Sequence, residues 1–241
     1  KSIARLRMHN ERAGGKGYRP SAANEERGKL TDTIAREITD YPSDKYFYDN
    51  DVTYYGEDIY VGYRYFETIP EAKNHVRYPF GFGLSYTQFE ISGRVCCESE
   101  GKIIAVATVK NIGNVAGKEV IQLYYSAPQG KLGKPAKELA AFKKTKLLAI
   151  GESQQITIEI PVNSLASYDD GGVTGNKSCY VLEKGEYIIY AGSDVRSAEK
   201  AASFIIEETI AVKQLTQALA ESGKSMSEYA EFIRIYPIPK V

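Results

Sequence analysis

The sequence predicts a mainly β protein: a β-sandwich that is preceded by a long irregular, aromatic-rich segment and followed by a short helical tail. Three observations support this prediction. Short apolar segments with strand-like alternation recur between residues 87 and 208, and turn residues separate them. No helix-length pattern alternates with these segments, which argues against a parallel α/β sheet. Before residue 87 the chain is rich in Tyr, Asp, Pro and Gly and shows little periodicity.

The bulk composition is that of a globular domain and excludes several classes of partner. The 241 residues are 43% hydrophobic and 26% charged, and a chain of this length can form one or two domains with a core. The formal net charge is zero, so no field of the whole chain steers it towards nucleic acid or an anionic membrane. No apolar run has membrane-spanning length. We therefore predict neither a nucleic-acid nor a membrane partner.

The first 30 residues are polar and strongly basic. Residues 14–17 read GGKG, but they lack the GxxxxGK[ST] spacing of a phosphate-binding loop and follow no apolar strand. Too few aromatic residues lie between the basic ones to indicate a nucleic-acid-binding arm. A flexible, solvated arm is the favoured interpretation.

Residues 31–86 form a long stretch without sustained periodicity. Its aromatic density is highest at 54–66 and 78–86. Long loops of this kind are uncommon inside a compact domain and are usually functional or interfacial. So many aromatic rings predict packing along another surface.

The strands of the predicted sandwich are at 103–109, 119–125, 156–160, 186–191 and 203–206. The first of them is apolar on both faces, as expected of a central strand. The second places Ile121, Leu123 and Tyr125 on one face. The third alternates strictly, with three isoleucines directed inward.

The end of the chain is predicted to be helical. Apolar residues recur at helical spacing at Ala211, Leu215, Ala218 and Leu219. Ser225 followed by Glu228 is a candidate capping box for a second helix. We predict a helical tail or linker over residues 209–241, which would suit a connector to a following domain.

Three motifs identify a family resemblance. Residues 54–66 read YYGEDIYVGYRYF, residues 79–87 read PFGFGLSYT, and residues 110–124 read KNIGNVAGKEVIQLY. These stretches resemble Y-x-E-[GD]-I-[YF]-V-G-Y-R-Y-[YF], P-F-G-[HFY]-G-L-S-Y-T and N-x-G-x-x-x-G-x-E-x-x-Q-L-Y of family 3 glycoside hydrolases of the β-glucosidase type. Together with a GKLT run at 28–31, the matches span residues 28–207 in the family's order.

The resemblance implies a domain organisation. Residues 1–86 would be a basic arm and a remnant of, or connector from, the family's α/β-sandwich domain. Residues 87–208 would form a fibronectin type III-like sandwich of the immunoglobulin type. The partners implied are the barrel and α/β-sandwich catalytic domains of the same enzyme, in the same or another chain. The sequence also allows a homo-oligomer.

The resemblance implies a reaction for the full enzyme, namely the hydrolysis of terminal β-D-glucosyl residues with retention. Such enzymes use two carboxyl groups about 5 Å apart, one as nucleophile and one as acid/base. No such pair is recognisable in this sequence. Asp44 follows no apolar strand, Asp194 lies in a predicted hairpin turn, and the adjacent Glu57 and Asp58 diverge. We predict no catalytic residue here.

Three tyrosines are candidates for binding the β-glucoside substrate: Tyr54, Tyr55 and Tyr63. Aromatic rings of this kind can stack on pyranose faces. Packing between domains is the favoured interpretation of the same rings.

The cysteines and histidines indicate neither a metal site nor a disulfide framework. Three cysteines, of which Cys96 and Cys97 are adjacent, form a poor disulfide framework, which favours a reducing compartment. His9 and His75 are far apart in the sequence, and no Cys/His cluster occurs. We expect no cofactor, no metal and a cytoplasmic location; a secreted protein would need a signal peptide upstream of residue 1.

The predicted function is that of a non-catalytic, carboxyl-proximal portion of a β-glucosidase-type enzyme that stabilises or completes the catalytic domains. The alternative is a stand-alone fibronectin type III-like binding or assembly module without hydrolase activity, because a fold does not fix a function. Against the alternative, an independent module has no evident reason to expose the aromatic stretch at 54–66.

Overall fold

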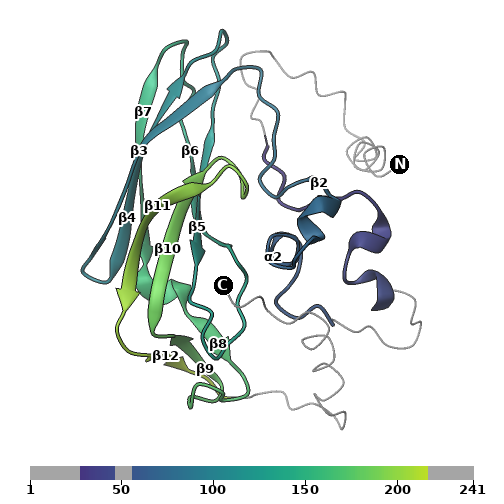
Figure 1. Ribbon diagram of the computed structural model, residues 1–241. Helices are drawn as coiled ribbons and strands as arrows, with labels where there is room; N and C mark the ends of the chain where they lie inside the picture. The colour runs from purple at the N-terminus through teal and green to yellow at the C-terminus, as the bar shows by residue number, and fades with distance from the viewer. Residues whose placement is uncertain (1–27, 47–55, 217–241) are drawn as a thin grey trace.

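Two antiparallel sheets face each other as a sandwich in the computed structural model, which describes residues 28–46 and 56–216 (Figure 1). A four-stranded sheet has the order β11-β10-β5-β6, and a three-stranded sheet has the order β3-β4-β7. Their bounds are β3 (Phe89–Ser99), β4 (Lys102–Asn111), β5 (Val120–Ser126), β6 (Glu138–Lys144), β7 (Ser153–Pro161), β10 (Gly185–Gly192) and β11 (Glu199–Ile206). The predicted mainly β sandwich is confirmed.

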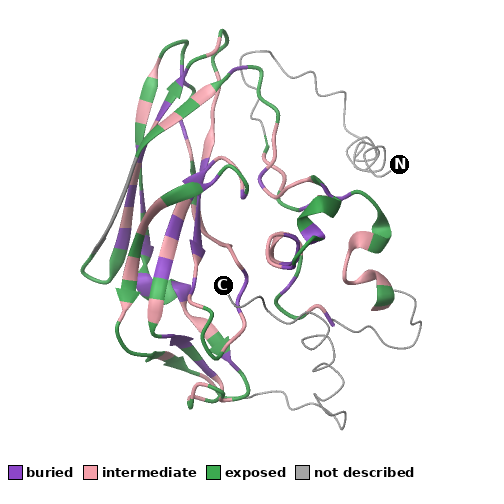
Figure 2. Cartoon of the chain, in the orientation of Figure 1, coloured by how far each residue is buried: buried purple, intermediate pink, exposed green. Residues whose placement is uncertain are grey.

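The main core lies between these two sheets. Strand β7 shows the predicted alternation: its isoleucines are buried, and the residues between them are exposed. Its register with β4 sets Ile160 opposite Ile103 and Ile158 opposite Ala105. Burial of each large aliphatic side chain contributes about 1.5–3 kcal/mol. Along β10, buried residues alternate with half-buried ones (Figure 2).

A small third sheet lies at one end of the sandwich. It has the order β12-β9-β8, with β8 (Ser167–Asp169), β9 (Cys179–Leu182) and β12 (Ile210–Gln214). The predicted start of the helical tail is therefore wrong, because residues 210–214 are a strand that pairs antiparallel with β9. Ala211 and Leu215 alone are a weak helical signal, and the free edge of β9 offers backbone hydrogen bonds that outweigh it. The rest of the predicted tail, from residue 217, lies outside the described residues.

The aromatic-rich segment forms a separate layer beside the four-stranded sheet (Figure 1). Its elements are short: β1 (Ile34–Ala35), η1 (Ile38–Asp40), η2 (Asp44–Tyr46), α2 (Tyr63–Phe66), η3 (Ala72–His75) and β2 (Val76–Tyr78). They enclose a small core in which Phe66 is completely buried and Tyr65 nearly so. The Tyr41 hydroxyl donates a hydrogen bond to the carbonyl of Thr33 and accepts one from the backbone N–H of Ala35. The layer thus has its own packing despite its lack of long elements.

Asp169 organises the loop between β8 and β9. Its carboxylate is fully buried and accepts hydrogen bonds from the backbone N–H groups of Gly172, Val173 and Thr174 at 2.6, 3.0 and 2.8 Å. The Thr174 hydroxyl donates a further bond of 2.6 Å. Although burial disfavours the charged form, these hydrogen bonds hold the pKa of Asp169 below its ordinary value.

Replacing Asp169 by Asn is expected to lower the free energy of unfolding by about 1–3 kcal/mol near neutral pH, because buried N–H donors lose their acceptor. A carboxylate with a depressed pKa stabilises the fold above the unfolded-state value of about 3.9 and loses that effect as pH falls through the folded-state pKa. Urea unfolding of both proteins at several pH values checks this. The two curves should converge in acid, and a constant gap down to that range contradicts the assignment.

Candidate functional site

The aromatic segment, here residues 56–86, contacts the outer face of the four-stranded sheet, and we call this contact the seam. At its centre are Tyr63 of α2, Phe80 after β2 and Tyr124 of β5. The rings of Tyr63 and Phe80 are 4.6 Å apart between centroids, and both meet Tyr124 edge-on at 6.2 and 6.5 Å. Val195 and Ala198 close the cluster from the turn between β10 and β11. Ring pairs in such arrangements add about 0.5–1.5 kcal/mol each beyond area burial.

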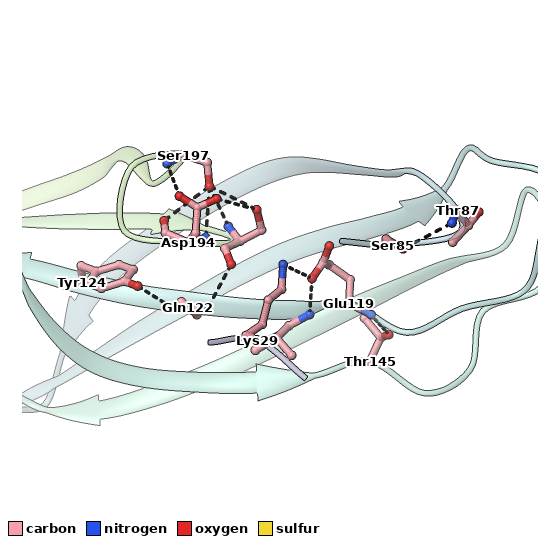
Figure 3. A network of polar contacts seen from close by, with 11 residues as sticks. Lys29, Ser85, Thr87, Glu119, Gln122, Tyr124, Thr145, Asp194 and Ser197 are labelled. Atoms are coloured by element: carbon pink, nitrogen blue, oxygen red, sulfur yellow. Dashed lines mark hydrogen bonds and ion pairs between the residues drawn. The ribbon is translucent and has the colours of Figure 1, made fainter. Parts of the chain in front are cut away.

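Strand β5 is buried on both faces. Ile121 and Leu123 point into the sandwich core, whereas Gln122 and Tyr124 point outward and are nevertheless buried by the seam. The Tyr124 hydroxyl donates to the Gln122 side-chain oxygen, and Gln122 Nε2 donates to the carbonyl of Ser193 at 2.9 Å (Figure 3). Burial raises the pKa of Tyr124 far above its usual range, so its hydroxyl remains a neutral donor.

Gly81 allows the two layers to approach closely. Its φ is +82°, and a Cβ at this position would lie 2.7 Å from Gln122 Nε2 and 2.9 Å from the Cα of Asp194. Only glycine adopts this conformation without cost and leaves that space empty. The neighbouring Phe80 carbonyl accepts a hydrogen bond of 3.2 Å from the backbone N–H of Val195. The aromatic segment and the β10–β11 turn thus meet backbone to backbone.

Asp194 holds that turn in shape. Its side chain accepts hydrogen bonds from the backbone N–H groups of Arg196 and Ser197, both at 2.8 Å (Figure 3). The prediction that it is a turn aspartate is confirmed. Asp194 therefore stabilises the turn to which it belongs.

Ion pairs surround the aromatic cluster. Arg196 Nε lies 2.8 Å from Glu67 Oε1, and Arg64 Nη2 lies 3.2 Å from Glu138 Oε2. Further along the seam, Lys29 pairs with Glu119 at 2.9 Å (Figure 3). Each of these pairs joins the aromatic segment or the residues before it to the sandwich.

Lys137 is a half-buried cation at the seam. Its Nζ donates to the carbonyls of Val195 and Ala198 at 3.0 and 3.2 Å and lies 4.6 Å from the ring centroid of Tyr190. Burial lowers the pKa of Lys137, while the carboxylates of Glu67 and Asp194 oppose that change. These contacts connect the start of β6 to the β10–β11 turn.

The motif at 110–124 carries the junction between residue 87 and the sandwich. The buried Asn111 accepts a hydrogen bond of 2.6 Å from the Thr87 hydroxyl and donates to the carbonyls of Val115 and Leu148 at 2.8 and 3.0 Å. A Cβ on Gly113 would lie 2.3 Å from Thr87 Oγ1. The spacing of the motif thus has a packing reason in this chain: it fixes the end of the aromatic segment against the sandwich.

The predicted substrate-binding tyrosines fall in different places. Tyr54 and Tyr55 lie outside the described residues. Tyr63 lies in the seam, where its hydroxyl accepts a hydrogen bond of 2.9 Å from the backbone N–H of Leu139. Its ring packs on Phe80 and Tyr124. These are the contacts of a packing residue.

The adjacent acidic candidates Glu57 and Asp58 lie at the start of the aromatic segment, just before α2. Glu57 has a carboxylate oxygen that is buried without a hydrogen-bond partner, and Asp58 has a left-handed backbone conformation with φ of +51°. Among the residues that the structure describes, no group of three or more His, Cys, Asp or Glu side chains could hold a metal ion. In the same part of the chain, no helix has the length and apolarity to cross a membrane.

Sequence reasoning missed Gln122 and Tyr124 as seam residues. Outward residues of a sandwich strand are expected to contact solvent, so a period-2 pattern assigns Gln122 and Tyr124 to the solvent-exposed face. One signal in the sequence could have indicated the seam: Tyr124 is an aromatic residue at an outward position. The aromatic-rich segment elsewhere in the chain was expected to pack along such a surface.

A family model and curated relatives match this chain. The model of the fibronectin type III-like domain matches residues 119–195. The chain is 58% identical over 193 residues to a β-glucosidase of Ruminococcus albus and 45% identical over 233 residues to β-glucosidase A of Butyrivibrio fibrisolvens. The matches cover 80% and 88% of this chain but 20% and 28% of the two relatives.

Solved structures agree. A β-glucosidase from Paenibacillus barengoltzii superposes with a TM-score of 0.73 and 49% identity, covering 79% of this chain and 22% of that protein. β-Glucosidase 3B from Thermotoga neapolitana gives a TM-score of 0.67 and 40% identity, with 76% and 25% covered. The chain therefore spans less than a third of the length of each of these proteins.

Proposed function

We propose a role that follows from one premise: the chain belongs to glycoside hydrolase family 3, as a non-catalytic, carboxyl-proximal portion of a β-glucosidase-type enzyme. Its role is to stabilise or complete the catalytic domains of a retaining β-glucosidase that hydrolyses terminal β-D-glucosyl residues. The division of the chain at residues 86 and 208 into connector, sandwich and tail is part of the same proposal, with the difference that the tail begins as strand β12 and not as a helix.

The seam is the observation that supports this role. Its aromatic cluster, its close backbone contacts and its ion pairs make one continuous interface between the aromatic segment and the sandwich. A segment fixed along its length in this way can hold whatever is joined to it in a defined orientation. Two carboxylates at the seam are already engaged, Asp194 with backbone N–H groups and Glu67 with Arg196.

The partners we propose are the barrel and α/β-sandwich domains of the same enzyme, in the same or another chain. Large apolar side chains remain exposed on the aromatic segment and the residues before it, at Ile38 (66%), Val61 (55%) and Leu84 (82%). Exposed apolar groups of this size are typical of a surface that another domain covers. The β-glucoside reaches the enzyme through those domains.

Replacing Tyr63 by Ala in the complete enzyme is expected to lower its melting temperature by several degrees, because the variant removes a ring from the seam. The kcat and KM for an aryl β-glucoside, measured well below that temperature, should stay within about twofold of the wild type. Tyr63→Phe keeps the ring and serves as the control; it should lose much less stability.

Two outcomes would overturn the proposal. A raised KM with an unchanged melting temperature would assign Tyr63 to the substrate. Hydrolysis of the same aryl β-glucoside by the purified 241-residue chain alone would show that the chain itself is catalytic.

A cytoplasmic location is also proposed. Cys179 is buried with a free thiol, and three cysteines with an adjacent pair suit a reducing compartment. Mass spectrometry of the protein after alkylation under native and denaturing conditions tests it: all three thiols should be recovered free.

A further inference from the structure

A groove opens beside the seam, between the start of the aromatic segment and the end of the sandwich that carries the small sheet. Its cavity volume is about 610 Å³, which lies within the range of small-molecule sites. The aromatic segment contributes residues 58–60 and Arg64, the loop before β6 contributes residues 132–135, and β8 and β9 contribute one tyrosine each. Neither the packing at the seam nor the proposed support of the catalytic domains accounts for this groove.

Two tyrosines form a platform in the groove. Tyr168 on β8 and Tyr180 on β9 lie directly opposite each other in the antiparallel register, with ring centroids 5.2 Å apart and planes at 50°. They are 41% and 39% exposed, whereas Tyr124 and Tyr187 are completely buried. Paired, half-exposed rings offer flat apolar faces to a ligand without the loss of much side-chain entropy.

A buried hydroxyl without a partner lies at the same groove. Tyr60 lines it, is 7% exposed, and its hydroxyl has no hydrogen-bond partner. Buried hydroxyls are normally satisfied, and each exception needs an explanation. Burial raises the pKa of Tyr60, and the carboxylates of Asp58 and Glu138, which also line the groove, raise it further. The hydroxyl therefore remains a neutral donor and acceptor on the carboxylate side of the groove.

The charged groups of the groove favour a neutral polar ligand. Asp58, Glu138 and Asp170 line it together with two cations that are already paired: Arg64 with Glu138 at 3.2 Å, and Lys134 with Glu183. Three carboxylates disfavour a phosphate or another anion. Carboxylates and a guanidinium beside flat rings match the two sides of a sugar, whose hydroxyls lie around its rim and whose C–H groups form its faces. Asp58 is also held at a positive φ of +51°, a conformation that costs free energy and is often found at binding sites.

We propose that this groove binds a neutral saccharide, with Tyr168 and Tyr180 stacked on pyranose rings and with Asp58, Tyr60 and the Arg64–Glu138 pair hydrogen-bonded to its hydroxyls. The site is one of binding and involves no bond cleavage. It extends the proposed function, because the sandwich end of the chain then holds a sugar as well as supporting other domains.

Calorimetric titration of the 241-residue chain with cellohexaose, a neutral β-linked glucan, tests the proposal. Binding is expected for the wild type. Tyr180→Ala and Tyr168→Ala should each weaken it about tenfold or more, and the double variant should abolish it. Tyr180→Phe keeps the ring and should bind within about twofold of the wild type. Phe142→Ala is the matched control, because Phe142 is an aromatic residue of β6 that is 68% exposed and does not line the groove.

Tyr60→Phe separates binding from folding. Removing an unpartnered buried hydroxyl should leave the melting temperature unchanged or raise it, while the affinity for cellohexaose falls several-fold. The absence of heat with the wild-type chain up to the solubility limit overturns the proposal. Binding by the folded double variant at wild-type affinity overturns it too. Neither result bears on turnover by the complete enzyme, which tests the proposed function separately.

Discussion

Replacing Lys134 by Met is expected to lower the free energy of unfolding by about 3–5 kcal/mol, because the change leaves a buried carboxylate uncompensated. Lys134 is 1% exposed and Glu183 is 5% exposed. Lys134 Nζ donates to a Glu183 carboxylate oxygen and, at 2.7 Å, to the carbonyl of Pro128. Glu183 also accepts hydrogen bonds from the backbone N–H groups of Lys131 and Leu132 at 2.7 and 3.2 Å. The pair thereby ties the loop before β6 to the end of β9.

Urea unfolding near neutral pH measures the effect. Lys131→Met is the matched control: it removes an exposed lysine from the same loop and should change stability by less than about 0.5 kcal/mol. Adding Glu183→Leu to Lys134→Met removes both charges and should recover part of the loss, because a buried pair can often be replaced by apolar residues. A loss below about 1 kcal/mol for Lys134→Met would mean that water reaches Glu183 and compensates its charge.

The same pair bears on the groove. Residues 132–135 form one of its walls, and Gly130 in this loop approaches Glu183 so closely that a Cβ would lie 2.4 Å from its Oε1. The ion pair and the hydrogen bonds from Lys131 and Leu132 to Glu183 fix this loop together, so loss of the Lys134 charge disturbs the wall of the groove. Affinity for cellohexaose should therefore fall in Lys134→Met even in the fraction that stays folded.

The sandwich strands were predictable because their information is local. Alternation in 156–160 fixes which side chains of β7 face the core, and the structure has the same three isoleucines buried. The same reasoning fails at β12, where the partner strand decides the conformation of residues 210–214. The spacing of apolar residues within a segment carries no information about a free strand edge elsewhere in the chain.

The seam and the groove were not predictable in the same way, since they depend on contacts between distant residues. Lys134 and Glu183 are charged, and a charged residue in a single sequence is expected at the surface. Tyr168 and Tyr180 become a pair only through the register of β8 with β9. Gln122 and Tyr124 are residues of a family motif, but the motif does not say which surface their side chains meet.

Replacing Tyr124 by Ala is expected to be the most damaging change at the seam, with a loss of about 3–5 kcal/mol, because the side chain is completely buried and a cavity would remain. The variant removes the ring on which Tyr63 and Phe80 pack. It also removes the hydroxyl that donates to Gln122. Tyr124→Phe keeps the ring and leaves only the Gln122 oxygen without its donor, for which about 1–3 kcal/mol is expected.

The location of that loss distinguishes a seam residue from an ordinary core residue. Hydrogen exchange in Tyr124→Ala should accelerate first in residues 56–86, while the amides of β4 and β7, on the other sheet, keep most of their protection. Tyr187→Ala is the comparison, because Tyr187 is an equally buried tyrosine of the main core and its removal should loosen both sheets. If the two variants lose protection in the same pattern, the aromatic segment and the sandwich unfold as one unit. In that case the described part of this chain would act as one rigid unit, and the seam would be part of the core of that unit.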